Sequence, residues 1–263
     1  MKLLGYKREM FYGLFMFIVL VTISAQVSVT GSLTHTIDSI PGVNYSRVIT
    51  IRNDGLVPHS VRVYQTDYSF QADGRVFYNL PGTTPRSNAG WITLPVTTLT
   101  INPGEELPIS YALRVPNSQN LLGTYWSVIM VESIIPGANP AEGINHIMRF
   151  AVQIINEFPG GYGSLTPIGA RLDNEDGTPT LIITLENDGT LMLRPTVSVE
   201  LYRRDGQVFG PFAADPRRMY PGTSAMFTLR LANVSAGDYR AIVLIDAEDE
   251  NLFAIQYNLE VKN

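Results

Sequence analysis

Residue types that commonly carry out catalysis are few in this chain and are not grouped. It contains no cysteine in 263 residues, which excludes disulfides, thiolate-bound zinc, iron–sulfur clusters and cysteine nucleophiles. The histidines, His35, His59 and His146, form no HExxH motif and lie near no usable acidic pair, so a zinc hydrolase is not predicted. The sequence also lacks G-x-S-x-G, a P-loop and a dinucleotide fingerprint. We therefore predict a protein that is not an enzyme and has no catalytic residues.

Two acidic clusters are candidates for a metal site. They lie at residues 173–177 (DNEDG) and 246–250 (DAEDE). Calcium prefers carboxylate oxygens at loop tips, but neither cluster has the spacing of an EF-hand loop. We interpret both clusters as solvated turns, and we predict no bound metal and no cofactor.

The composition excludes further classes of partner. The formal net charge is −5 and the pI is near 5.2, which argues against binding to nucleic acid. Beyond residue 25 the only lysine is Lys262, so the chain offers no polybasic surface to an anionic membrane. With 45% hydrophobic residues, the chain has enough apolar side chains to build a packed core.

Residues 1–25 have the pattern of a secretory signal peptide. A basic start precedes an apolar run at 11–23, and the small residues Ser24 and Ala25 follow it. The run is shorter than the about 20 residues of a membrane-spanning helix. An uncleaved anchor is the alternative, because Ile23 is larger than the cleavage pattern prefers, and only then would the protein be held at the membrane. We therefore predict export to the periplasm or the cell surface.

The chain contains an internal duplication. Four landmarks recur in the same order: ITIRNDG at 49–55 and ITLENDG at 183–189, DGRVF at 73–77 and DGQVF at 205–209, Pro-Gly at 103–104 and 221–222, and Gly-x-Tyr at 123–125 and 237–239. The offset between the copies falls between the second and third landmarks. The first half therefore carries an insertion near residues 78–95.

Apolar and polar residues alternate with a period of two, which predicts β-strands with one face in a core. Residues 107–115 (LPISYALRV) are a clear example, and turn signals such as NDG and NPG separate the strands. About seven short strands in each half, without helices, predict an all-β fold of two tandem immunoglobulin-like antiparallel β-sandwiches. The predicted domains are residues 26–157 and 162–263, joined by a linker at 158–161. Tyr125 and Tyr239 each fit a tyrosine corner.

Two strands of the first domain are apolar on both faces, so something must cover the second face. The second domain, the insertion or another protein could do so, the last by adding a strand at the sheet edge. The candidate partner-binding residues on this face are Trp126, Val128, Met130, Ile147, Arg149, Ala151, Gln153 and Ile155.

The insertion supplies a second kind of candidate site. Residues typical of an exposed loop precede Trp91 in the insertion. Loops on β-sandwiches often contain the residues that bind a partner or ligand. Arg86 and Trp91 are therefore candidate loop-binding residues. A tolerated surface insertion is the alternative interpretation.

Three segments resemble the N-terminal domain of periplasmic pilus chaperones, which are PapD-like tandem immunoglobulin-like proteins. They lie at 91–117 (WITLPVTTLTINPGEELPISYALRVPN), 125–137 (YWSVIMVESIIPG) and 144–159 (INHIMRFAVQIINEFP). The order of features is also similar to that of two-domain surface proteins of Gram-positive bacteria that bind WxL proteins and peptidoglycan.

The resemblance to chaperones implies that the strand at 146–155 lends apolar side chains to a subunit that lacks a strand. Chaperones of that family hold the C-terminal carboxylate of the bound subunit with an Arg on the first strand and a Lys on the last. The chain departs from the family at these positions. Residues 26–39 contain neither, and the strand at 146–155 has Arg149 but no Lys, with Gln153 nearer the Lys position.

The function predicted from these features is an exported, non-enzymatic protein-binding module. It would act as a chaperone-like protein or assembly partner for a surface or envelope structure such as a pilus. Its partner would be another exported, β-strand-rich protein, bound through the edge and apolar face of domain 1. The alternative is a cell-surface structural or adhesion module that binds wall or polysaccharide through loops.

Overall fold

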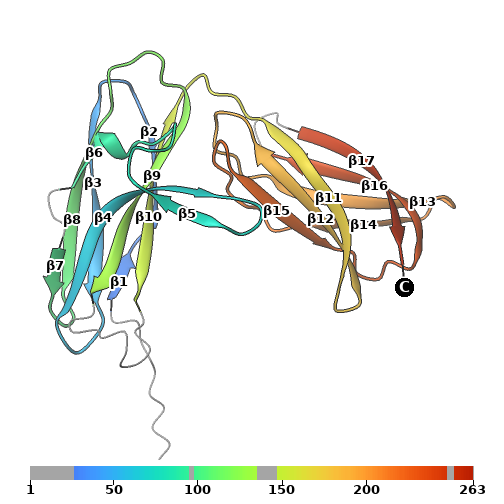
Figure 1. The fold of residues 1–263 in the computed structure, drawn as a ribbon, viewed down its shortest axis with the longest axis horizontal. Helices are drawn as coiled ribbons and strands as arrows, with labels where there is room; N and C mark the ends of the chain where they lie inside the picture. Colours follow the sequence, from blue (N-terminus) through green and yellow to red (C-terminus); the bar gives the residue numbers. More distant parts are fainter. Residues whose placement is uncertain (1–26, 95–97, 135–146, 248–251, 263) are drawn as a thin grey trace, which may run out of the picture.

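The computed structural model describes residues 27–94, 98–134, 147–247 and 252–262. Two β-sandwiches follow one another along these residues, as Figure 1 shows, and a short 3-10 helix, η1 (Ala89–Trp91), is their only helical element. The predicted fold of two tandem immunoglobulin-like β-sandwiches is confirmed. In the described ranges no helix is long and apolar enough to cross a membrane, and the expected signal peptide lies outside them.

The first sandwich consists of two sheets with strand orders β1-β3-β8-β6 and β2-β10-β9-β4-β5, and β7 also pairs with β4. The chain changes sheets between β1 and β2, so that β2 runs parallel to β10. The strands are β1 (Val27–Thr30), β2 (Thr34–Asp38), β3 (Asn44–Asn53), β4 (His59–Phe70), β5 (Val76–Asn79), β6 (Ile92–Thr93), β7 (Thr98–Ile101), β8 (Glu106–Arg114), β9 (Gly123–Ile134) and β10 (Arg149–Phe158).

The second sandwich has sheets ordered β11-β12-β15 and β14-β13-β16-β17. Its strands are β11 (Leu165–Glu175), β12 (Thr178–Asn187), β13 (Thr196–Arg203), β14 (Val208–Ala213), β15 (Ser224–Arg230), β16 (Gly237–Asp246) and β17 (Leu252–Val261). In both domains the apolar members of the alternating pattern meet between the sheets, for example Leu113 and Ile129 in the first core and Phe227 and Val243 in the second.

The two NDG sequences form the same buried turn, which confirms the duplication in three dimensions. The Nδ2 atoms of Asn53 and Asn187 each donate to two main-chain carbonyl oxygens, at 2.8–2.9 Å. In both copies the asparagine Oδ1 accepts from the N–H two residues later, and the asparagine carbonyl accepts from the glycine of the Pro-Gly turn. Each asparagine therefore ties its strand end to two other turns, so the pattern depends on an amide side chain at that position.

The tyrosine-corner prediction holds for one of the two tyrosines. The Tyr239 hydroxyl donates to the carbonyl oxygen of Ser235 at 2.8 Å, and its ring is buried. Among the hydrogen bonds of the described residues, none joins the Tyr125 hydroxyl to the main chain. The Tyr125 ring packs instead against Trp91 and Phe158, with centroids 5.1 and 5.7 Å away.

Replacing Tyr239 with phenylalanine is expected to lower the free energy of unfolding of the second domain by about 1 kcal/mol. The ring packing is kept, but the Ser235 carbonyl loses the donor that the Tyr239 hydroxyl supplies. Urea denaturation followed by circular dichroism measures the change. Tyr257→Phe in the same domain is the control and should leave the midpoint unchanged; equal midpoints for all three proteins would contradict the tyrosine corner.

Candidate protein-binding site

The outer face of the β2-β10-β9-β4-β5 sheet brings together the residues proposed from sequence as a partner surface. Four cross-strand pairs of β10 and β9 line it: Ile155 with Trp126, Gln153 with Val128, Ala151 with Met130, and Arg149 with Glu132. Ile147 lies just before β10. The opposite faces of these two strands point into the core of the first domain.

The second domain covers the end of this face that is nearer the linker. Trp126 and Ile155 form a buried cluster with Tyr220, which precedes β15 in the second domain. The Tyr220 ring stacks on Trp126 with centroids 4.7 Å apart and an interplanar angle of 16°. The indole N–H of Trp126 donates to the carbonyl oxygen of Tyr68 at 2.6 Å. The two domains therefore share a small apolar core (the interdomain cluster: Trp126, Ile155 and Tyr220).

Two donors of the second domain hold Gln153. Its Oε1 accepts from Nη1 of Arg218 at 2.8 Å and from the Tyr220 hydroxyl at 2.7 Å. The same Arg218 nitrogen donates to Oγ1 of Thr34 on β2 at 3.1 Å. Burial raises the pKa of Tyr220, so its hydroxyl stays protonated and remains a donor. These contacts fix the covered half of β10 against the second domain.

The open part of the face is therefore smaller than the sequence predicted. Trp126, Val128, Met130 and Ile155 are each at most 3% exposed, so they are not available to a partner in this structure. Ile147, by contrast, is 54% exposed. The second domain provides part of the cover, which was one of the three possibilities that the alternating pattern left open.

An ionic cluster occupies the opposite end of the face. The Glu132 carboxylate accepts from Nη2 of Arg62 at 2.7 Å, from Nε of Arg149 at 2.6 Å and from the Tyr64 hydroxyl at 2.9 Å. Burial would raise the pKa of Glu132, but these three hydrogen bonds outweigh it and hold the pKa below its usual value. The side chains of Arg62 and Arg149 remain 53% and 57% exposed. The cluster thus presents a net positive charge beside the start of β10.

Part of β10 has no paired strand on the edge that faces away from β9. β9 pairs with the whole of β10, whereas β2 pairs only with Gln153 to Glu157. The Gln153 N–H points away from β9, because it donates to the carbonyl oxygen of Leu33 at 2.8 Å. Main-chain groups alternate in direction along a strand, so those of Arg149 and Ala151 point the same way. No described strand pairs with that side of β10, and residues 149–152 form an open edge (the β10 open edge).

Asp67, which was not among the candidate residues, organises the insertion. This fully buried carboxylate accepts from the N–H groups of Gly82, Thr83 and Thr84 at 3.1, 2.8 and 2.7 Å, and also from the Ser87 hydroxyl. A lone acidic residue within a strand was the only sequence signal for this role.

The two loop-binding candidates make contacts inside the chain. Nη2 of Arg86 donates to the carbonyl oxygens of Leu122 at 2.7 Å and Thr190 at 3.3 Å, and its guanidinium lies 4.7 Å from the centroid of the Tyr125 ring. Trp91 packs against that same tyrosine. Arg86 therefore connects the insertion to both domains, and Trp91 packs it against the first.

Glu157 lies where β2, β10 and the second domain meet. Burial raises the pKa of its carboxyl group, nearby Asp38 raises it further, and Arg218 lowers it by a smaller amount. The pKa in the folded state is therefore above that in the unfolded state. Ionisation of Glu157 therefore opposes folding. The contribution of protonated Glu157 to the stability of the fold is fully present below the unfolded-state pKa, and it is lost as the pH rises through the folded-state pKa.

Glu157→Gln is accordingly expected to raise the melting temperature at about pH 7 and to change it little at about pH 4. The amide removes an ionisation that the site disfavours and keeps the side-chain volume. Thermal unfolding followed by circular dichroism across this pH range measures the difference. Glu175→Gln, at the exposed end of β11, serves as the control; a Glu157→Gln melting temperature that follows the parent protein at every pH would contradict the account.

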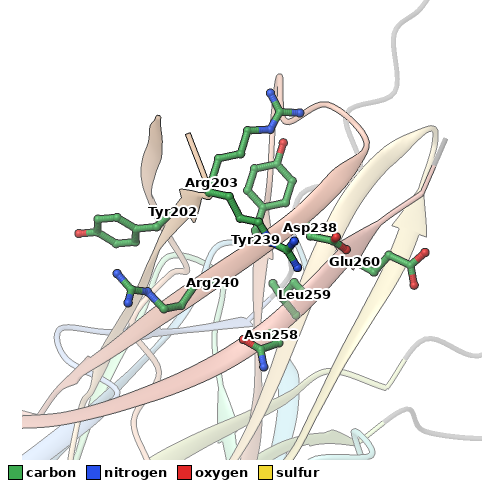
Figure 2. Close-up of a pocket in the computed structure, with 9 residues that line it drawn as sticks. Tyr202, Arg203, Asp238, Tyr239, Arg240, Asn258, Leu259 and Glu260 are labelled. Atoms are coloured by element: carbon green, nitrogen blue, oxygen red, sulfur yellow. The ribbon is translucent and has the colours of Figure 1, made fainter. Parts of the chain in front are cut away.

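A hollow of 640 Å³ lies at one end of the second domain, shown in Figure 2. Two of its arginines contact neighbouring side chains: Nη2 of Arg203 donates to Ser235 Oγ at 3.1 Å, and Arg240 lies 5.4 Å from the centroid of the Tyr202 ring. The lining residues are Tyr202, Arg203, Arg204, Asp238, Tyr239, Arg240, Asn258, Leu259 and Glu260. We assign no ligand to it.

The described residues contain no group of three or more acidic or histidine side chains placed to hold a metal ion. Residues 248–250 of the second acidic cluster lie outside those ranges.

No protein-family model matches the chain, and a search of curated proteins finds no match. Solved structures of pilus chaperones are similar to it across both domains. A chain of the chaperone–tip adhesin complex of CFA/I fimbriae is 10% identical, with 89% of this chain and 98% of that chain covered and a TM-score of 0.49. The class 5 fimbriae chaperone CfaA is 10% identical, with coverage of 90% and 100% and a TM-score of 0.46.

A third similar structure is the CsuC–CsuE chaperone–tip adhesion subunit pre-assembly complex of Acinetobacter baumannii. It is 13% identical, with 88% of this chain and 98% of that chain covered and a TM-score of 0.44. The similarity of these solved structures to the chain concerns the fold alone.

Proposed function

We propose that this chain is an exported protein-binding module that acts as a chaperone or assembly partner for a surface or envelope structure. It holds another exported, β-strand-rich protein on the β10 open edge. The observation that carries the proposal is the main chain of Arg149 and Ala151, which points away from β9 toward a side where no described strand pairs with β10. An unpaired strand edge is a template for strand addition.

The side chains around the open edge favour such a partner. Exposed apolar side chains flank it, Leu33 where β2 begins to cover β10 and Ile147 just before the edge. Phe150, on the core-facing side of the edge, is only partly buried. An added strand with alternating apolar residues would cover these groups and remove apolar area from water.

The ionic cluster adds a preference about charge. Arg62 and Arg149 share the single carboxylate of Glu132, so an acidic residue on the partner strand would meet unneutralised positive charge. The covered half of β10 is held by Arg218 and Tyr220, which keeps the open edge in an extended conformation before the partner arrives. Such preorganisation lowers the ordering cost of binding.

Ile147→Asp is expected to abolish retention of the partner while leaving the fold intact. The substitution places a charge in the apolar contact, and Ile147 is 54% exposed, so its loss costs the core little. The test is affinity capture of the tagged full chain from its native envelope, with the partner quantified by mass spectrometry.

Ile168→Asp on β11 is the matched control, since Ile168 is 51% exposed on the other domain. The control should retain the same partner at the level of the parent protein. Equal capture by both variants, or equal loss, would overturn the proposed site. Ile155→Asp is not an equivalent test, because Ile155 belongs to the interdomain cluster and its replacement is expected to disturb domain packing.

A further inference from the structure

Most edge strands in the described residues are short or interrupted. β1, β2, β5, β6 and β7 contain two to five residues each. In the second domain, the pairing of β11 shifts between Pro167 and Gly169, and β14 contains Gly210 and Pro211 beside a shift in its partner strand. β15 begins at Ser224, whose hydroxyl accepts from the Ala72 N–H of the first domain. Short strands, bulges, prolines and covering segments all prevent edge-to-edge pairing.

β17 has none of these protections. It runs ten residues from Leu252 to Val261 and pairs with β16 over its whole length without a register shift. Its sequence, LFAIQYNLEV, contains no proline or glycine, and Glu260 is its only charged residue. No described strand pairs with its other side. Figure 1 shows it at the margin of the second domain.

Comparison of the two domains shows what is missing beside β17. In the first domain the last strand, β10, is joined by β2 over five residue pairs. In the second domain the first strand, β11, stays with β12 along its whole length, so no described strand takes the place of β2. The inward side chains of β17 are only partly buried, whereas Val152 and Ile154 of β10 are fully buried. These partly buried residues are Phe253, Ile255, Tyr257 and Leu259.

We propose that β17 pairs with β17 of a second copy of this chain, antiparallel, about a two-fold axis at Gln256. Such an interface is isologous, so the strand must be complementary to itself. β17 meets this requirement. On the inner face, Phe253 lies opposite Leu259 of the second copy, and Ile255 lies opposite Tyr257. On the outer face, Leu252 lies opposite Glu260, Ala254 opposite Asn258, and Gln256 opposite Gln256 of the second copy.

This pairing opposes no like charges and places apolar residues against apolar residues along the inner face. Cross-strand pairs of these kinds stabilise antiparallel sheets, whereas directly opposed like charges destabilise them. The four-stranded sheets of the two copies would become continuous across the axis. The absence of a charge near the centre of β17 is what permits a second copy to approach, since Gln256 would meet itself there.

Sedimentation of the full chain over a range of concentrations tests the proposal. We expect a reversible dimer, and Gln256→Lys, which opposes two positive charges at the axis, should weaken it at least about tenfold. Gln256 is exposed, so the variant should fold normally. Gln207→Lys, at the exposed turn between β13 and β14, makes the same substitution away from the axis and should dimerise like the parent protein.

Gln256→Cys supplies a second readout. The chain has no other cysteine, and directly opposed residues in an antiparallel pair have Cα atoms about 4.5–5.5 Å apart, within the range for a disulfide. Oxidation should therefore give a covalent dimer, and Gln207→Cys should not. A parent chain that stays monomeric would overturn the proposal, as would a dimer that Gln256→Lys leaves intact and that Gln256→Cys fails to cross-link. These outcomes are independent of partner capture at β10, on the other domain.

Discussion

Truncating Tyr220 to alanine is expected to separate the two domains. Its ring is almost completely buried, stacks on Trp126 and donates a hydrogen bond to Gln153 at 2.7 Å. Truncation removes the stacking partner and leaves the Gln153 amide oxygen with one donor fewer. Replacing a buried aromatic residue with alanine typically costs about 3–5 kcal/mol. Here that loss falls mainly on the contact between the domains, because Tyr220 lies in the interdomain cluster.

Small-angle scattering and tryptophan fluorescence measure the separation. The maximum dimension should increase, and the emission of Trp126 should shift to the red as water reaches it. Tyr162→Ala, directly after the predicted linker, is the control, since that side chain is exposed, and should change neither signal. Unchanged scattering and emission for Tyr220→Ala would show that the interdomain cluster does not hold the domains together.

Asp67→Ala is expected to release the insertion and to lower the free energy of unfolding of the first domain by about 1–3 kcal/mol. Three main-chain N–H groups and the Ser87 hydroxyl lose their shared acceptor. Gly82 and Thr83 are exposed, so water replaces part of what their N–H groups lose. Because residues 86–88 bond to Trp126 on β9, the effect should extend to the edge of the sheet.

Urea denaturation combined with limited proteolysis measures this effect, with new cleavage expected within residues 80–88. Asp73→Ala is the matched control. Asp73 also accepts a main-chain N–H, that of Arg75, but at an exposed turn, so its loss should cost far less. A proteolysis pattern for Asp67→Ala that matches the control would contradict the role assigned to this carboxylate.

The fold could be predicted because its determinants are local and repeated. Alternation of apolar and polar residues identifies strands with one buried face, and the two NDG motifs mark equivalent positions in each half. The structure shows why that motif recurs: Asn53 and Asn187 are buried and make the same set of hydrogen bonds. An asparagine at this position hydrogen-bonds the main-chain groups of several turns at once. The fold therefore requires the same residue that makes the motif recognisable in the sequence.

The candidate site was only partly predictable, because the residues that bury part of this sheet face come from a distant part of the chain. The apolar second face of β9 and β10 indicated that Trp126 and Ile155 must be covered. Nothing local indicates that Tyr220 and Arg218 provide the cover, since those residues lie in the other domain and reach β10 only through domain packing. The boundary of the β10 open edge was equally hidden, because it depends on where β2 stops pairing.

The central claim is that a partner strand pairs with the β10 open edge, and amide hydrogen exchange at Arg149 and Ala151 tests it most directly. In the free chain these two N–H groups should exchange fast, while those of Phe150 and Val152, which point toward β9, should be protected. In the complex captured from the envelope, exchange at Arg149 and Ala151 should slow by at least about tenfold, with Phe150 and Val152 unchanged. Slow exchange at Arg149 and Ala151 in the free chain, or fast exchange in the complex, would contradict the claim.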